Sequence, residues 1–209
     1  MKIITILPEV EAEAVLHKFG RRSLRAPISR EMIYLPYLLF RYRVAWTTLG
    51  GRGRSMDGLL CADLLQGLPM SVPKATRFAL GDGLAEEMAS FAGLLEPPHP
   101  KRTVALTRLD VPEEGRLPGV LSESEAAERG KKILRYDLMR LFGGLRFRRI
   151  EIAPLAGGKV LYYPYWLVYY KDGRGRMRFD AFDALNGQKE KGEITRSIKL
   201  GLLKKNGKL

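Results

Sequence analysis

The pattern of hydrophobic and polar positions in this 209-residue chain predicts two long β-strands rich in aromatic residues. The first covers Met32 to Trp46 and the second covers Val160 to Lys171. Side chains alternate between the two faces of a strand, and on the second strand both sets are mostly apolar or aromatic. One face can pack on a helix, so the other face needs a second cover.

The two strands share a Tyr-x-Pro-Tyr motif, and the residues that follow each motif also correspond in order. Each copy continues into an Arg-Gly-Arg turn and then into Asp-x-x-x-Gly. From these ordered matches we expect an internal duplication. The copies run from Tyr34-Leu35-Pro36-Tyr37 through Arg52-Gly53-Arg54 to Asp63 and Gly67, and from Tyr162-Tyr163-Pro164-Tyr165 through Arg174-Gly175-Arg176 to Asp183 and Gly187.

Apolar residues at spacings of three and four predict helices before each aromatic strand and at the end of the chain. The helix after Ser122 opens with a capping box, because Glu125 stands three residues beyond the serine. The expected helices are Pro8 to Gly20, Leu84 to Leu95, Ser122 to Phe142 and Glu193 to Lys205. Further strands are expected at Ser23 to Ser29, in the run ending near Asp63, and at Thr103 to Leu109, Leu145 to Ala153 and Arg176 to Ala184.

These elements predict an α+β fold of two repeated units, each a helix plus a three-stranded antiparallel meander, related by a pseudo-twofold axis. We expect the first repeat over residues 1–70, a proline-rich connector with a helix over 71–120, and the second repeat with a basic tail over 121–209. Pro164 has no N–H to donate, so we expect it on an edge strand or at a bulge.

Composition adds a strong positive charge and a single cysteine. The net charge of +13 favours polyanionic partners such as nucleic acid or anionic lipid, although charge also serves solubility. Cys61 alone excludes an intramolecular disulfide and a multi-cysteine zinc site, which favours a reducing, cytoplasmic setting. We find no window near the roughly 18 apolar residues that a membrane-spanning helix needs.

Candidate catalytic chemistry is sparse. His17 and His99 are the only histidines, and neither stands in a catalytic or metal-binding pattern. The run from Gly50 to Arg54 lacks the Lys-Ser/Thr of a phosphate loop, and Asp63 and Asp183 fit ordinary turn chemistry. We therefore predict no catalytic residue, no metal and no cofactor, and treat an enzyme as the third hypothesis.

The candidate binding residues are of two kinds. The aromatic residues either form a packed seam between the two copies or line a groove that stacks on a ligand. The basic residues could form an anion- or partner-binding surface, which a solvated charged face would equally explain. The aromatic set is Tyr34, Tyr37, Tyr163, Tyr165 and Trp166; the basic set is Arg52, Arg54, Arg146, Arg148, Arg149, Arg174, Arg176, Lys204 and Lys205.

The run Tyr163-Pro164-Tyr165-Trp166, followed by Tyr169-Tyr170, a glycine-containing turn, a strand and Asp183-x-x-x-Gly187, resembles a pattern in uncharacterised bacterial proteins. There the pattern often lies beside a zinc ribbon or membrane segments, and this chain has no cysteine pair. The order of helix and meander is similar to cystatin-like and PepSY-like α+β units. PepSY-like units are associated with regulation of peptidases, but no residue here matches an inhibitory motif.

The leading functional hypothesis is a non-enzymatic binding or assembly module that presents a basic surface to a protein or anionic partner. The alternative is a nucleic-acid-binding protein, which the charge, the arginines and the aromatic residues favour. Two further contacts are open: homodimerisation through the aromatic strands, and peripheral membrane contact through the amphipathic tail, where Ile194, Ile198 and Leu202 lie four residues apart.

Overall fold

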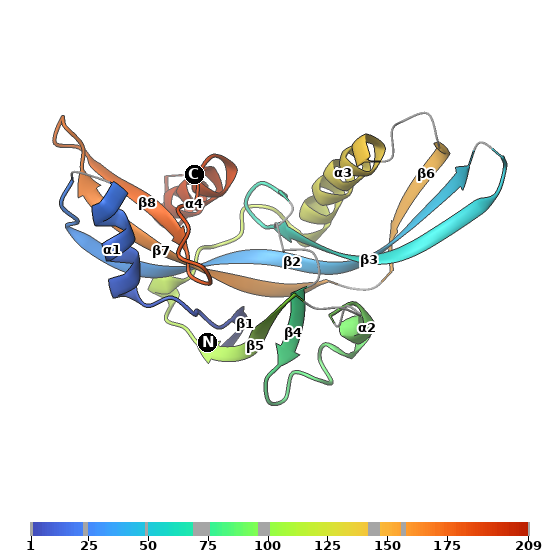
Figure 1. Cartoon of the computed structure of the whole chain (residues 1–209), viewed down its shortest axis with the longest axis horizontal. Helices are drawn as coiled ribbons and strands as arrows, with labels where there is room; N and C mark the ends of the chain where they lie inside the picture. Colours follow the sequence, from blue (N-terminus) through green and yellow to red (C-terminus); the bar gives the residue numbers. More distant parts are fainter. Residues whose placement is uncertain are drawn as a thin grey trace.

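The computed structural model describes residues 2–22, 25–48, 50–68, 76–95, 101–141, 147–155 and 158–208. Its strands form one mixed eight-stranded sheet in the order β3-β2-β7-β1-β5-β4, with β6 added beside β2 and β8 beside β7 (Figure 1). The strands are β1 (Lys2–Ile6), β2 (Ser29–Thr48), β3 (Gly53–Asp63), β4 (Thr76–Leu80), β5 (Arg102–Asp110), β6 (Phe147–Pro154), β7 (Lys159–Lys171) and β8 (Met177–Asp183). The helices are α1 (Ala12–Arg22), α2 (Ala92–Leu95), α3 (Glu123–Leu141) and α4 (Glu193–Lys205), with short 3₁₀ turns η1 (Ala89–Phe91) and η2 (Glu113–Gly115).

The two aromatic strands pair directly with each other at the centre of the sheet. β2 and β7 run antiparallel, and Leu35 lies opposite Tyr163. On either side of this pair the prolines face tyrosines, because Tyr34 lies opposite Pro164 and Pro36 lies opposite Tyr162. The Tyr-x-Pro-Tyr motifs therefore form one shared seam between the strands.

Both prolines occupy interior positions of these central strands, so the expectation of an edge strand or a bulge for Pro164 is wrong. The carbonyl of Pro164 accepts from the Ala184 N–H at 3.3 Å, and that of Pro36 accepts from the Leu64 N–H at 2.9 Å. In a strand the N and O of one residue point to the same side, so both prolyl nitrogens face away from the seam. On the side of β7 away from β2, the neighbouring strand is β1 at Tyr162 and β8 from Tyr165 onward. The missing N–H of Pro164 therefore removes no hydrogen bond between β2 and β7.

The expected pair of helix-plus-meander units is wrong. β6 was expected to pair with β7, but it pairs with β2, with Tyr42 opposite Pro154. Residues 25–28 form no strand ahead of β2, and residues 76–110 add β4 and β5 to the same sheet. The architecture is thus one continuous mixed sheet instead of two meanders related by a pseudo-twofold axis.

α1 and α3 each pack on the strand pair that lies farther from them in sequence. Val15 and Phe19 of α1 are buried against Val168 and Phe182 of β7 and β8. Toward the other end of the molecule, α3 buries Ala126 against residues of β2 and β3 (Figure 1). The helix that precedes one strand pair therefore covers the other pair.

Hydrogen bonds from α1 and α3 to the two Asp-x-x-x-Gly turns support this exchange, in which each helix covers the strand pair of the other half. Lys18 Nζ of α1 donates to the Asn186 carbonyl at 2.7 Å. Arg129 Nη1 of α3 donates to the Gln66 carbonyl at 3.3 Å, so each helix is tied to a turn from the other half of the chain.

Several local predictions are confirmed, and their causes are visible. The capping box opens α3, because Ser122 N donates to Glu125 Oε2 at 2.9 Å and Glu125 N donates to Ser122 Oγ at 3.3 Å. α1 begins at Ala12 instead of Pro8, and the N–H groups of Glu9 and Val10 ahead of it both donate to the Ala184 carbonyl at 2.9 Å.

The segment between the two halves is more ordered than a connector requires. The expected strand from Thr103 to Leu109 is confirmed as β5, which pairs with β1 and with β4. The expected helix is shorter, reduced to η1 and α2, yet its four apolar residues are all buried: Leu84, Met88, Phe91 and Leu95. β1 was not predicted at all, although it lies in the interior of the sheet.

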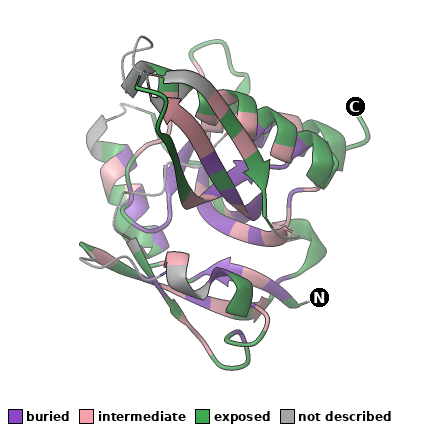
Figure 2. Ribbon diagram, turned by 90° about the vertical axis from the view of Figure 1, so that its right-hand side faces the viewer, coloured by how far each residue is buried: buried purple, intermediate pink, exposed green. Residues whose placement is uncertain are grey.

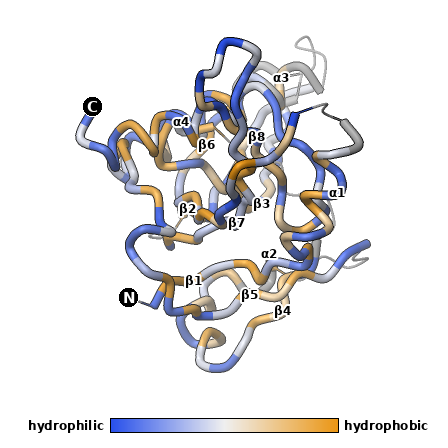
Figure 3. The backbone as a smooth tube through the Cα atoms, turned by 90° about the vertical axis from the view of Figure 1, so that its left-hand side faces the viewer, coloured by the Kyte–Doolittle hydropathy of each residue, from blue (hydrophilic) through white to orange (hydrophobic). Residues whose placement is uncertain are grey.

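The C-terminal helix α4 has the predicted bounds, and it docks on the body of the protein. Ile198 is fully buried in the main core, and Ile194 and Leu202 pack against that core. Hydrophobic stretches lie within the strands and α4, while the loops between them are more hydrophilic (Figure 3). The apolar face of the tail is therefore used in packing. Among the described residues, no helix has both the length and the apolarity needed to cross a bilayer.

The Tyr37–Tyr165 pair offers a direct test of the seam. Their hydroxyls lie 3.1 Å apart in the core, and burial raises the pKa of both well above the usual value. We expect Tyr37→Phe to lower the free energy of unfolding by about 1–3 kcal/mol, because the buried Tyr165 hydroxyl loses this partner. Denaturant unfolding measures the change.

The double variant Tyr37→Phe/Tyr165→Phe is the control for this prediction. It removes both polar groups at once, so its cost should be smaller than the sum of the two single substitutions. Strict additivity would show that the two hydroxyls do not stabilise each other.

Candidate functional site

The five aromatic candidates belong to the interior of the protein. Tyr37 is fully buried, Tyr34, Tyr163 and Tyr165 are almost so, and Trp166 is half-buried with its indole N–H donating to the Val10 carbonyl at 2.8 Å. The rings of Tyr163 and Tyr165 lie 4.9 Å apart. These side chains pack the seam, and burial leaves the rings of Tyr37, Tyr163 and Tyr165 no open surface on which a base could stack.

The two aspartates that end the matching motifs are buried and committed to structure. Asp63 Oδ1 accepts from three N–H groups of its own turn, and Ser197 Oγ of α4 donates to Asp63 Oδ2 at 2.9 Å. Asp183 Oδ1 accepts from Leu185 N at 2.7 Å and from the Tyr163 hydroxyl at 3.0 Å. Carboxylates with this many donors hold turns and strands together, as ordinary turn chemistry predicted.

The predicted basic residues fall into three separate regions. The first lies where β2, β3 and β6 run side by side: Arg52 and Arg54 are exposed at the β2–β3 turn, and Thr47 of β2 is opposite both Gly53 of β3 and Arg149 of β6. Arg148 precedes Arg149 on β6, and Arg146 lies outside the described residues. The structure therefore brings the backbone of two distant basic segments together here.

The second region is the β7–β8 turn, at the opposite end of the molecule (Figure 1). Asp172 accepts hydrogen bonds from the backbone N–H groups of Arg174 and Arg176 and from the side chains of Arg176 and Arg178. These hydrogen bonds, led by that from the Arg176 N–H, hold the pKa of Asp172 well below its usual range. One carboxylate therefore orders this turn and offsets one of its positive charges.

The third region is an open groove of about 550 Å³ beside the end of α4. Lys204 Nζ donates to the Gly119 carbonyl at 2.6 Å, and Lys205 Nζ donates to the Glu114 carbonyl. Both predicted lysines thus tie α4 to the loop before α3. The charges of the lining nearly balance, since it consists of Glu113, Glu114, Arg116, Leu117, Pro118, Tyr162, Lys204 and Lys205.

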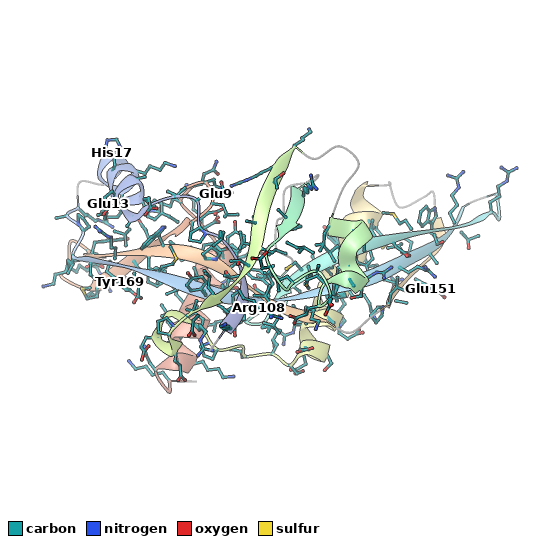
Figure 4. The ribbon with its side chains drawn as sticks, turned by 90° about the horizontal axis from the view of Figure 1, so that it is seen from below. Glu9, Glu13, His17, Arg108, Glu151 and Tyr169 are labelled. Carbon is teal, nitrogen blue, oxygen red and sulfur yellow. The ribbon has the colours of Figure 1, made fainter. Side chains whose placement is uncertain are left out.

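The first region belongs to a part of the protein that we call the arm: residues 40–60 of β2 and β3, residues 129–141 of α3, and residues 147–154 of β6. The arm extends to one end of the molecule, with α3 along one of its faces (Figure 1). In Figure 4, Glu151 lies in the arm, and His17 and Glu13 of α1 lie at the far end. The exposed positions of the arm end are seen in Figure 2.

The arm holds most of the net charge of the chain. Its segments contain eleven basic and three acidic residues, an excess of eight out of +13 in about a fifth of the chain. The remaining four-fifths therefore carry an excess of only five. The positive charge is concentrated in one place instead of being spread over the surface.

On the face of the arm away from α3, arginines cluster around one carboxylate. Arg43 Nε donates to Asp57 Oδ1 at 2.7 Å, and Arg41 Nη2 lies 3.7 Å from Asp57 Oδ2. The hydrogen bond from Arg43 lowers the pKa of Asp57. The Arg41 side chain also reaches the Ser90 carbonyl at 2.8 Å, which connects the arm to the turn before α2.

Sequence reasoning missed several residues of the arm as site candidates. Arg41 and Arg43 alternate with apolar residues on β2, and Lys132, Arg135 and Tyr136 share the exposed side of α3. For α3 the spacing of these three residues, at i, i+3 and i+4, places them on one side of a helix and could have indicated a shared surface. That Arg41 and Arg43 of β2 belong to the same basic region as β6 could be recognised only from the pairing of the two strands.

Metal and thiol chemistry find no support in the described part of the chain. Across these residues no three His, Cys, Asp or Glu side chains gather as metal ligands would. Cys61 is a buried free thiol, and burial raises its pKa, so it packs as a small apolar group. His17 is exposed on α1, and His99 lies outside the described residues.

Comparisons with known proteins identify no relative of this chain. No family model matches it, and no curated protein or solved structure matches it at a significant level. The resemblance of the run from Tyr163 to Gly187 to uncharacterised bacterial proteins stays a prediction, as does the similarity to cystatin-like and PepSY-like units.

Glu190 generates a prediction on pH dependence. Burial and the nearby Asp183 carboxylate raise the pKa of Glu190 in the folded protein. A raised folded-state pKa means that stability is fully present below the unfolded pKa and is lost as pH rises through the folded value. We expect Glu190→Gln to be more stable than the wild type at neutral pH, by no more than about 1 kcal/mol because solvent screens the group.

Thermal or denaturant unfolding across the pH range checks this expectation. The gain should shrink toward zero as the pH falls below the pKa of both states, because wild-type Glu190 is then neutral as well. The variant Glu86→Gln, at an exposed position, is the matched control for the loss of one carboxylate. A gain that persists unchanged in acid would assign the effect to packing.

Proposed function

We propose that the chain is a non-enzymatic binding module that docks its basic arm on a polyanionic partner. The observation that carries this proposal is the concentration of eight of the thirteen net positive charges in the arm. Charge that serves only solubility has no reason to collect on one extension of the fold. A concentrated positive field attracts polyanions and speeds their association.

The shape of the arm supports the same function. Arg52 and Arg54 are exposed at its outer turn, and Arg43 has about half of its side chain exposed at 52%. Lys132 and Arg135 are exposed on the outer side of α3. Cations on several sides of an extension allow contact with a long, flexible anion that follows the surface.

The interior supports binding over catalysis. The buried carboxylates Asp63 and Asp183 are occupied by hydrogen bonds that hold their turns, and Cys61 is buried with a raised pKa. A general base or nucleophile needs an accessible lone pair, which these groups lack. The free, buried Cys61 also supports our placement of the chain in the reducing cytoplasm.

The matching Arg-Gly-Arg turns provide the test. We expect Arg52→Ala/Arg54→Ala to weaken binding to heparin and to generic oligonucleotides, and to reduce the slope of log K against log salt by roughly 1–2. Fluorescence anisotropy at a series of salt concentrations measures both quantities.

The control removes two exposed cations from the opposite end of the molecule. Lys171→Ala/Arg174→Ala deletes the same charge from the β7–β8 region and should leave the slope nearly unchanged. Equal losses in the two double variants would show a nonspecific effect of net charge. No binding by the wild type at low salt would reject the proposed function.

A further inference from the structure

Tyr136 is the most exposed large hydrophobic side chain of the described residues, with 68% of its surface accessible. It lies on the outer side of α3, where Met139 is also 46% exposed. The inner side of the same helix packs Leu134 and Leu138 against β2 and β6. Tyr136 is therefore not needed for the core.

Two exposed cations lie beside this ring on the helix surface, both on its N-terminal side. Lys132 lies four residues before Tyr136, one helical turn or about 6 Å along the axis, and so on the same side of α3. Arg135 precedes Tyr136 directly, and both basic side chains are exposed. The helix thus presents an aromatic surface with positive charge beside it.

This combination fits a nucleic acid with unpaired bases. Every base has a π-face that stacks on an aromatic side chain, while Lys and Arg contact the phosphates on either side. In a duplex the bases are already stacked on one another, so an exposed tyrosine gains little from it. The neighbouring Met139 adds a polarizable apolar contact for the same base.

Other partners fit the face less well. A membrane-surface helix needs a free apolar face, and the apolar face of α3 is packed on the sheet. A second copy of the chain would bring two arms together, each with an excess of eight positive charges, so their repulsion opposes self-association through this surface.

We propose that the arm binds single-stranded nucleic acid, with Tyr136 stacking on an unpaired base and Lys132 and Arg135 contacting the flanking phosphates. This inference rests on the proposed function, since the arm must first bind a polyanion. It deepens that function by naming the partner class and the residue that recognises it.

The test compares full-length wild type with Tyr136→Ala, Tyr136→Phe and Tyr136→Trp. The ligands are a labelled single strand of about 20 nucleotides, long enough for several bases to reach the helix, the matching duplex, and heparin. We expect Tyr136→Ala to raise the Kd for the single strand about 5- to 100-fold, from the usual contribution of one stacked base. The phenylalanine and tryptophan variants should retain binding.

Two further measurements separate stacking from charge and from folding. Tyr136→Ala removes no charge, so its salt slope should equal that of the wild type, and its binding to duplex and heparin should not change. Its melting temperature should also stay unchanged, because the ring is exposed.

Several outcomes overturn the inference. Unchanged single-strand binding by Tyr136→Ala does so, as does equal affinity of the wild type for single strand, duplex and heparin; in both cases the proposed polyanion-binding function stands. A Tyr136→Ala variant that loses self-association or binding to anionic vesicles instead assigns the face to a second copy or to a membrane. If Arg52→Ala/Arg54→Ala changes no polyanion affinity, the proposed function itself fails.

Discussion

The pairing of β2 with β7 across their two proline-containing stretches is the constraint on which the rest of the structure depends. Pro36 and Pro164 remove N–H groups, yet both nitrogens face away from the shared ladder, so the seam keeps its hydrogen bonds. Slipping by one residue would turn each proline toward the ladder and every buried aromatic ring toward the wrong face. The register is thus fixed by backbone chemistry and by burial together.

From that register follow the positions of the other elements. The Asp63 turn comes to lie beside Ser197 of α4, and the Asp183 turn comes to lie beside Tyr163. The same pairing carries the outer part of β2 beyond the end of β7, where β3 and β6 can join it. The arm is therefore a consequence of one strand being much longer than the overlap that the seam uses.

Local sequence patterns predicted the elements well and their partners poorly. The capping box at Ser122 and the apolar spacing in α4 are signals carried by a few neighbouring residues, and both helices formed as expected. β1 was missed because five residues give little pattern, while its position depends on β5, about a hundred residues away. Nothing within the sequence of β6 indicates whether it pairs with β7 or with β2.

In the candidate site, too, local features could be predicted from the sequence, and features that depend on distant contacts could not. The Arg-Gly-Arg turns look equivalent in sequence, but Asp172 stands just before the second turn and binds its arginines, while the first has no such carboxylate before it. The aromatic seam was one of two alternatives, and only burial decided between them. The charge of the arm could not be recognised from sequence, because its segments are some eighty residues apart.

The exchange of α1 and α3 between the two strand pairs also has a consequence for synthesis on the ribosome. When β2 and β3 have emerged, Phe40 and Leu60 have no cover until α3 follows, and α1 has no surface to bind until β7 and β8 are made. Neither half of the nascent chain can bury its core alone. Folding must therefore wait for nearly complete translation, and a product truncated before β7 would display an apolar sheet face to chaperones and proteases.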